Sequence, residues 1–264
     1  MPYAKILLAG HSGSGKTFTA AGADSPFVLL FEPQGELACH AGYQSGERAG
    51  LPLEVHHCSV DSHGLKSALD SLALLSEPRT IVVDSLSAVQ QSIVRTIAQG
   101  KSGSDPAAKM RTLTLPEWDL ATKWLLNWLD RVLSVAHDVL VIVHAQRPED
   151  LLGRQLVLEP SLEGKRVNDF LHQRFTAVGL LHPIFDRTTR STERVVVFDP
   201  AVELDGRLFR AKPGPGLRSV ETPNPHLWIS NMRRSVTGHD PSGPVPKIKI
   251  SPLPAPQKVI ARLP

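Results

Sequence analysis

The feature that most constrains the fold of this chain is an eight-residue segment near its start, G-H-S-G-S-G-K-T, which fits the pattern G-x-x-x-x-G-K-[S/T]. The apolar residues 4–9 precede the segment and K-T-F-T-A-A follows it, so the sequence predicts a strand, a glycine-rich loop and a helix. Glycines let a backbone wrap closely around an anion with its N–H groups pointing inward. The segment therefore predicts a loop that binds the phosphates of a nucleotide, built from Gly10, His11, Ser12, Gly13, Ser14, Gly15, Lys16 and Thr17.

Two side chains of this loop have separate expected roles. Lys16 supplies a positive charge for the β- and γ-phosphates, and the hydroxyl of Thr17 is a ligand for Mg²⁺. The N-terminus of the following helix adds unpaired N–H donors. The loop thus predicts a bound nucleoside triphosphate with its magnesium ion.

Two acids follow apolar runs that predict buried strands. Residues 80–83 lead directly into Asp84, and residues 27–31 lead into Glu32. The carboxyl ends of parallel strands are where α/β sheets bind ligands. We expect Asp84 to hold the water shell of the magnesium opposite Thr17, and Glu32 to orient the attacking water as a general base.

The apolar run 139–143 continues into H-A-Q-R, which offers a fourth site position. Either His144 or Gln146 could contact the γ-phosphate, and one residue of strand register decides between them. The alternative for the histidine is a structural role that closes the strand through a backbone hydrogen bond. Glu36 is the corresponding alternative to Glu32.

The rest of the chain to about residue 238 alternates predicted strands and helices, with helical spacing over residues 61–75 and 115–135. This order predicts an α/β fold with a mostly parallel sheet flanked by helices. Residues 176–185 and 194–198 flank a polar turn, which predicts a C-terminal antiparallel hairpin at the sheet edge. All four site positions then meet at one edge of the sheet.

Composition separates a body from a tail. The chain has 264 residues, of which 41% are hydrophobic, and a net charge of +3. Residues 240–264 hold 7 prolines and carry that whole charge, so the other residues are balanced. We expect an ATPase domain over residues 1–238 and a basic, proline-rich flexible tail over residues 239–264.

The sequence also bears on location. It has no apolar run of about 20 residues, the length of a membrane span, and the first motif begins where a signal peptide would stand. Cys39 and Cys58 are the only cysteines, so no disulfide framework is expected. We expect a cytoplasmic protein without a membrane partner.

The order and spacing of four segments resemble the RecA-like ATPase core. These segments are the glycine-rich loop and residues 27–32, 80–85 and 141–144. Three further features resemble the Sak group of phage proteins. They are L-P-E-W at the start of the long predicted helix, the histidine that ends the fifth predicted strand, and D-F-L-H-Q-R-F before a later strand. Those proteins are RecA-like single-strand annealing proteins, often described as AAA-family ATPases. The resemblance covers roughly residues 3–235.

The resemblance implies Mg²⁺-dependent ATP hydrolysis, expected to be slow and linked to DNA, and ATP-dependent binding and annealing of single-stranded DNA in phage recombination. It also implies assembly into rings or filaments, a single-strand binding protein as partner, and the host cytoplasm as location. Glu32 matches the family's water-activating glutamate, Asp84 its second nucleotide motif and His144 its γ-phosphate sensor, and the glycine-rich loop is its Walker A motif. Relatives often carry an acid-Glu-Gly-Gly pattern where this chain has F-E-P-Q-G.

By the same resemblance, two segments are candidate DNA-contact loops, residues 98–111 and 147–166. A charged loop can equally be only solvated. A cation borrowed from a neighbouring subunit is also expected near the γ-phosphate, with Arg210 and Lys212 as candidates. The DNA-contact candidates are Lys101, Lys109, Arg111, Arg147, Arg154, Lys165 and Arg166.

Two other functions fit the same residues. One is a RecA-like motor or helicase loader in phage replication, which would unwind forked duplex. The other is a DNA-binding module in which ATP only sets assembly and turnover is negligible.

Overall fold

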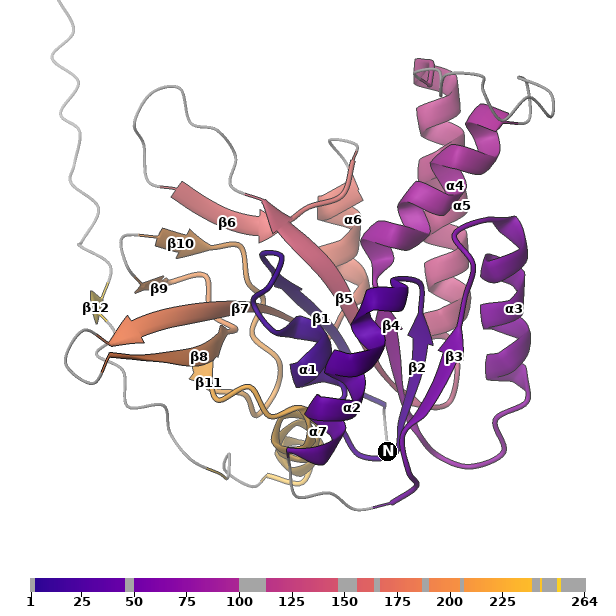
Figure 1. The fold of residues 1–264 in the computed structure, drawn as a ribbon. Coiled ribbons are helices and arrows are strands. Elements are labelled where there is room, and N and C mark those ends of the chain that lie inside the picture. The colour runs from indigo at the N-terminus through magenta and orange to yellow at the C-terminus, as the bar shows by residue number, and fades with distance from the viewer. Residues whose placement is uncertain are drawn as a thin grey trace, which may run out of the picture.

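The fold is built on a sheet with helices packed beside it (Figure 1). The buried strands of this sheet are short apolar runs. The computed structural model describes residues 3–45, 50–99, 113–146, 156–163, 167–186, 190–204, 207–238, 243 and 251–252. Across the sheet, the parallel strands lie in the order β3 (Glu54–His57), β2 (Pro26–Leu30), β4 (Thr80–Asp84), β5 (Asp138–Gln146), β1 (Lys5–Gly10) and β7 (Ala177–Asp186). The antiparallel β8 (Ser191–Val197) and β11 (Val220–Glu221) extend the sheet beyond β7.

Helices cover both faces of this sheet. One core cluster joins a sheet face to α3 (Ser62–Ala73), α4 (Leu86–Gln99), α5 (Leu115–Leu133) and α6 (Val167–Arg174). The other joins the opposite face to α1 (Lys16–Ala20), α2 (Glu36–Gln44) and α7 (Pro225–Ser235). A short 3₁₀ helix, Pro33–Gly35, lies between β2 and α2. The predicted α/β class, with its mostly parallel sheet and flanking helices, is confirmed.

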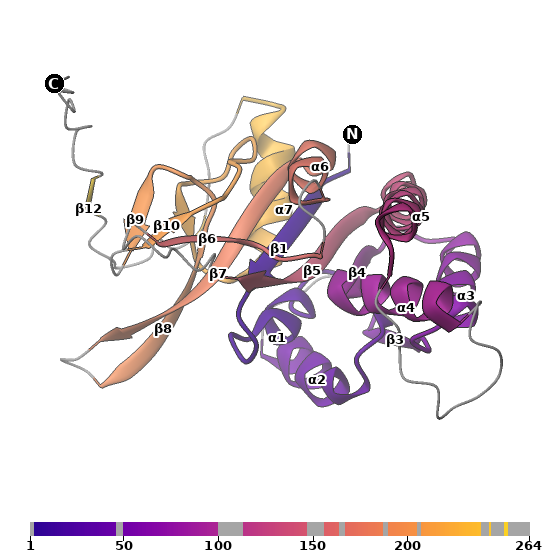
Figure 2. The ribbon, with the colours of Figure 1, turned by 90° about the horizontal axis from the view of Figure 1, so that it is seen from above.

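The strand register places the predicted site positions at one edge. Gly10 at the end of β1 pairs with His144 of β5, and Leu30 of β2 pairs with Asp84 at the end of β4. Because all four strands run parallel, their carboxyl ends meet on the same side of the sheet. The predicted hairpin is also confirmed as β7 and β8, whose far end extends beyond the rest of the sheet (Figure 2).

A second, smaller sheet was not expected from the sequence. It contains β6 (Leu156–Pro160), β10 (Arg207–Phe209), β9 (Val202–Leu204) and β12 (Ser251–Pro252). The end of β5 joins it through the pair Ala145 and Pro160. The expectation that residues 147–166 form one loop is therefore wrong, because β6 lies within that segment. Of the predicted tail, only residues 243 and 251–252 lie in the described part, and β12 pairs there with β9.

Within the described residues, none of the helices combines the length and the apolar character needed to cross a membrane.

Candidate functional site

The glycine-rich loop connects β1 to α1 in a conformation that its glycines require. Gly13 and Gly15 have φ of 74° and 95°, in the left-handed region that favours glycine. At Gly10 a Cβ atom would lie 2.7 Å from the Oγ of Ser14 and 3.1 Å from the carbonyl oxygen of Leu181. The Ser14 hydroxyl is buried and has no hydrogen-bond partner among the residues that the structure describes. The loop is therefore a close-packed backbone turn with a polar group available to a ligand.

Lys16 lies folded into this turn. Its Nζ donates hydrogen bonds to the carbonyl oxygens of Gly10, at 2.9 Å, and His11, at 2.7 Å. The side chain is buried, and this burial lowers the pKa of the ammonium group, although Asp84 and Glu32 oppose the shift. A phosphate oxygen carries more negative charge than a carbonyl, so it is the stronger acceptor for this ammonium group.

Thr17 and Asp84 join the loop to β4. The hydroxyl of Thr17 donates a hydrogen bond of 2.7 Å to Oδ2 of Asp84, which is 3% exposed. Burial raises the pKa of the Asp84 carboxyl to about 6, against the opposing effects of the hydrogen bond from Thr17 and the charge of Lys16. Gly35 packs against the same Asp84 oxygen, since a Cβ at position 35 would lie only 3.2 Å from it.

The Asp84→Asn variant is expected to be more stable than the wild type without ligand. Below pH 3.8 the Asp84 carboxyl is protonated in both the folded protein and the unfolded chain. As the pH rises towards about 6, the carboxyl loses its proton first in the unfolded chain. The free energy of unfolding of the wild type therefore falls over this range. Above pH 6 the uncharged amide of Asp84→Asn should raise the free energy of unfolding above that of the wild type by up to about 3 kcal/mol. Urea unfolding in EDTA at pH 4 and pH 7.5 measures this difference.

The gain in the free energy of unfolding of Asp84→Asn over the wild type should be present at pH 7.5 and nearly absent at pH 4. The exposed carboxyl of Asp70 on α3 provides the control, and Asp70→Asn should change stability by less than about 0.5 kcal/mol. A loss of stability in Asp84→Asn at pH 7.5 would contradict the conclusion that burial of the Asp84 charge outweighs its stabilisation by Thr17 and Lys16.

Glu32 lies next to this pair, at the start of the turn that follows β2. The hydroxyl of Ser85 donates to its Oε1, and Nε2 of His144 lies 3.6 Å from the same oxygen. The interaction with His144 lowers the pKa of Glu32, burial opposes the shift, and the hydrogen bond from Ser85 adds to it. Glu32 is therefore held as a carboxylate beside the loop, in the ionisation state that a water-orienting base needs.

His144 lies at the fourth candidate position, at the end of β5. Its backbone N–H donates to Ser87 Oγ at 3.2 Å, and its ring faces Glu32. The side chain of Gln146 lies outside the described residues. Between the two candidates left open by the sequence, the structure brings the histidine to Glu32.

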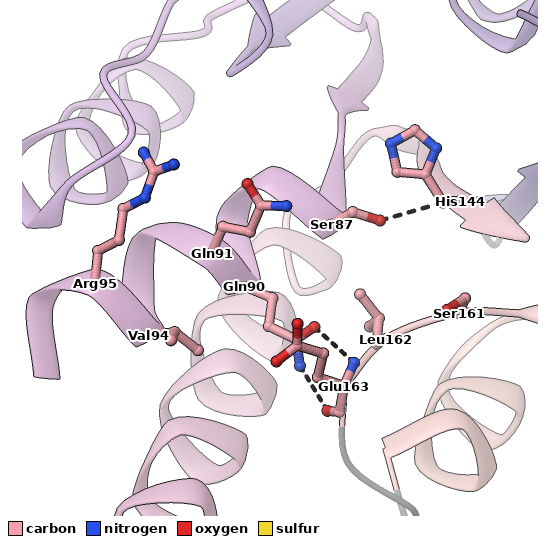
Figure 3. A pocket seen from close by; sticks show the side chains of 9 residues that line it. All are labelled: Ser87, Gln90, Gln91, Val94, Arg95, His144, Ser161, Leu162 and Glu163. Carbon is pink, nitrogen blue, oxygen red and sulfur yellow. Dashed lines mark hydrogen bonds between the residues drawn. The ribbon is translucent and has the colours of Figure 1, made fainter. Parts of the chain in front are cut away.

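A cavity of about 450 Å³ adjoins the ring of His144 (Figure 3). It lies between α4 and the segment 161–163, which Gln90 holds by two hydrogen bonds to the backbone of Glu163, at 2.7 and 2.8 Å. A neighbouring cavity of about 340 Å³ reaches Glu32, and both are lined by Arg95 and Gln91. The first turns of α4 thus contact the site on one side and segment 161–163 on the other.

Ser85, Ser87 and Gln90 were not predicted as site residues. Their position immediately after Asp84 was the available signal, because a helix that begins at the end of a site strand brings its first residues to the ligand. The contact of Gln90 with Glu163 joins residues 73 positions apart, and no local pattern indicates it.

The candidate cations for a neighbouring subunit's γ-phosphate, Arg210 and Lys212, make their contacts away from the loop. Arg210 forms ion pairs with Glu159, at 3.0 Å, and with Asp169. Lys212 donates to the carbonyl oxygens of His172, at 3.0 Å, and Phe175, at 2.6 Å. Both cations are thus used within the chain. All seven candidate DNA contacts lie outside the described residues: Lys101, Lys109, Arg111, Arg147, Arg154, Lys165 and Arg166.

The residues fit a magnesium nucleotide. The backbone is open at Gly13, where a Cβ would have no atom within 4 Å, and Ser14 offers a buried hydroxyl. Thr17 and Asp84 supply the oxygen ligands that magnesium prefers. Phosphates would lie against the loop and Lys16, with the metal on the side of Thr17.

Comparison with known proteins supports this assignment at the level of family. A family profile described as AAA domain matches residues 3–207. No curated protein sequence matches the chain.

Three solved structures show a distant similarity to this chain. An ATPase of the type III secretion system of pathogenic bacteria has 13% identity and a TM-score of 0.39, and the match covers 67% of this chain and 51% of that one. This chain thus spans about half the length of that relative. A KaiC-like protein of Pyrococcus horikoshii has 16% identity and a TM-score of 0.36, with coverage of 75% and 79%. The flagellar accessory protein FlaH of Methanocaldococcus jannaschii has 11% identity and a TM-score of 0.36, with coverage of 75% and 78%.

Proposed function

The chain belongs to the AAA-domain family of P-loop NTPases, and we propose that it binds and hydrolyses Mg²⁺-ATP and uses the nucleotide to control binding and annealing of single-stranded DNA. The observation that carries the nucleotide part is the hydrogen bond of 2.7 Å between Thr17 and Asp84. It joins the phosphate-binding loop to the acid of a second strand, which is the ligand pair a magnesium triphosphate requires.

The residues at this edge of the sheet have separate roles in nucleotide binding and hydrolysis. Backbone N–H groups of the loop and the ammonium of Lys16 bind and orient the phosphates. Magnesium held at Thr17 and Asp84 would offset charge on the phosphate oxygens. Glu32 accepts a hydrogen bond from the attacking water and orients it, while His144 keeps that carboxylate ionised.

The DNA part of the proposal depends on the position of the two cavities. The side chain of Arg95 on α4 is exposed and lines both of them, and one is shared with Glu32 and His144. The candidate basic segments continue from the described ends of these same elements: one follows α4, and the other begins after β5 and ends after Glu163. We infer that a strand of DNA held there would lie beside Glu32 and His144.

Binding of a labelled single-stranded oligonucleotide without nucleotide, with ADP and with Mg²⁺-ATP tests the proposal. We expect tighter binding with ATP than with ADP, faster annealing of complementary strands with ATP, and a change in ATP turnover when DNA is added. Phosphate contacts make such binding weaker in high salt. Unwinding of a forked duplex would favour the motor alternative, and DNA binding with no turnover would favour the nucleotide-gated module.

Assembly into a ring or filament is part of the same proposal. Sizing in ATP and in ADP tests it, with a larger assembly expected in ATP. Since Arg210 and Lys212 are both paired within the chain, a neighbouring subunit would have to break these contacts to donate either cation.

A further inference from the structure

The hairpin of β7 and β8 reaches past the carboxyl end of β1. Leu180 of β7 pairs with Ala9 of β1, and the hairpin continues beyond that level (Figure 2). On β8, Arg194 lies opposite Pro183, which is in the extension. Because β7 lies beside β1, the extension stands next to the loop that follows β1.

Arg194 contacts this loop at Gly15. The Nε, Cδ and Cζ atoms of Arg194 lie 3.2, 3.5 and 3.6 Å from the position that a Cβ of Gly15 would take. A Cβ at position 15 would require Arg194 to shift slightly, and the φ of 95° at Gly15 already favours glycine there. Arg194 is exposed, and within the described part of the chain no acid holds it as Glu159 and Asp169 hold Arg210.

We propose that Arg194 is a phosphate-binding residue of its own chain's nucleotide site, a proposal that depends on the function proposed above. The triphosphate carries more negative charge than Lys16 and one divalent cation offset together, so a further cation beside the loop would stabilise it. A guanidinium group suits this role because its fixed fork of donors matches phosphate oxygens. The site would then obtain this charge within one chain, from the hairpin.

The affinity of the Arg194→Gln variant for Mg²⁺-ATP tests this assignment. We expect the Kd to rise about 10- to 30-fold, as for loss of one charge-assisted phosphate contact, and Arg194→Lys to recover part of the affinity. The loss should shrink in high salt. Arg190 is exposed at the turn of the same hairpin, and Arg190→Gln should leave the Kd within about twofold. Thermal unfolding without nucleotide checks that both variants fold.

A mixing experiment separates action within the chain from action between subunits. Lys16→Ala subunits carry an intact Arg194, and Arg194→Gln subunits carry an intact loop. If Arg194 acts within its own chain, the mixture binds ATP no better than the sum of its parts, whereas recovery of affinity would overturn the assignment.

The outcomes also separate this inference from the proposed function. If Arg194→Gln binds ATP as the wild type does while Lys16→Ala does not, the role of Arg194 is refuted and the nucleotide function stands. If the wild type binds no nucleotide, the function itself is refuted.

Discussion

Replacing Lys16 by alanine is expected to lower the affinity for Mg²⁺-ATP by about 10²- to 10³-fold, or about 3–4 kcal/mol, and so to abolish every activity that depends on the nucleotide. Lys16 is buried inside the turn, with its ammonium group already directed at backbone oxygens of the loop. Its charge is thus positioned before the phosphate arrives, and none of its binding energy is spent on ordering the side chain.

Lys5 gives a matched control for this variant. Its Nζ also donates to two carbonyl oxygens, of Val135 at 3.0 Å and His137 at 2.8 Å, but at the opposite end of β1. Lys5→Ala should therefore lower stability without changing the Kd for ATP. Calorimetric titration of both variants measures the difference, and equal affinity of Lys16→Ala and wild type would contradict the site.

The grouping of the candidate residues at one sheet edge could be predicted because these residues follow one rule of chain organisation. Glu32, Asp84 and His144 each come at the end of an apolar run, and the loop follows another. Buried parallel strands are continuous apolar runs, so both their ends and their common edge can be found without knowing the strand order. The register of β1 with β5 then brings His144 beside Gly10.

The contacts that refine the site depend on tertiary structure and could not be found this way. The ion pairs of Arg210 join residues 51 and 41 positions apart, on elements whose packing no local pattern specifies. The place of Arg194 against Gly15 is set by the pairing of β8 with β7. A basic residue near a strand end was a reasonable choice for a free cation, but Arg210 meets two acids there.

The small sheet was missed for a different reason. Its strands β9 and β10 are three residues long, V-E-L and R-L-F, too short for an alternating pattern to be distinguished from a loop. The strand β6 ends in Glu159 and Pro160, residue types that are depleted in strands. These strands are held by their neighbours, since β6 pairs with both β5 and β10.

The Glu32→Gln variant should separate binding from turnover. The amide keeps an oxygen that accepts the hydrogen bond from Ser85 but loses the negative charge that aligns and polarises a water. We expect the Kd for ATP to stay within about threefold, or to fall slightly because a negative charge near the phosphates is gone, and kcat to drop by about 10²- to 10⁴-fold. Phosphate release at saturating ATP measures kcat, and titration with the nucleotide measures binding.

Glu36 makes this test specific to one carboxylate. It begins α2 four residues after Glu32, but its side chain is 49% exposed and lies near His57, at 3.5 Å, and His40, at 4.0 Å, rather than near Ser85 and His144. Glu36→Gln should therefore keep kcat within about twofold, as expected for an exposed ion pair. Loss of turnover in Glu36→Gln but not in Glu32→Gln would move the base to Glu36. If neither variant changed turnover, the water would have to be oriented by a group other than these two acids, and the contact between His144 and Glu32 would be structural.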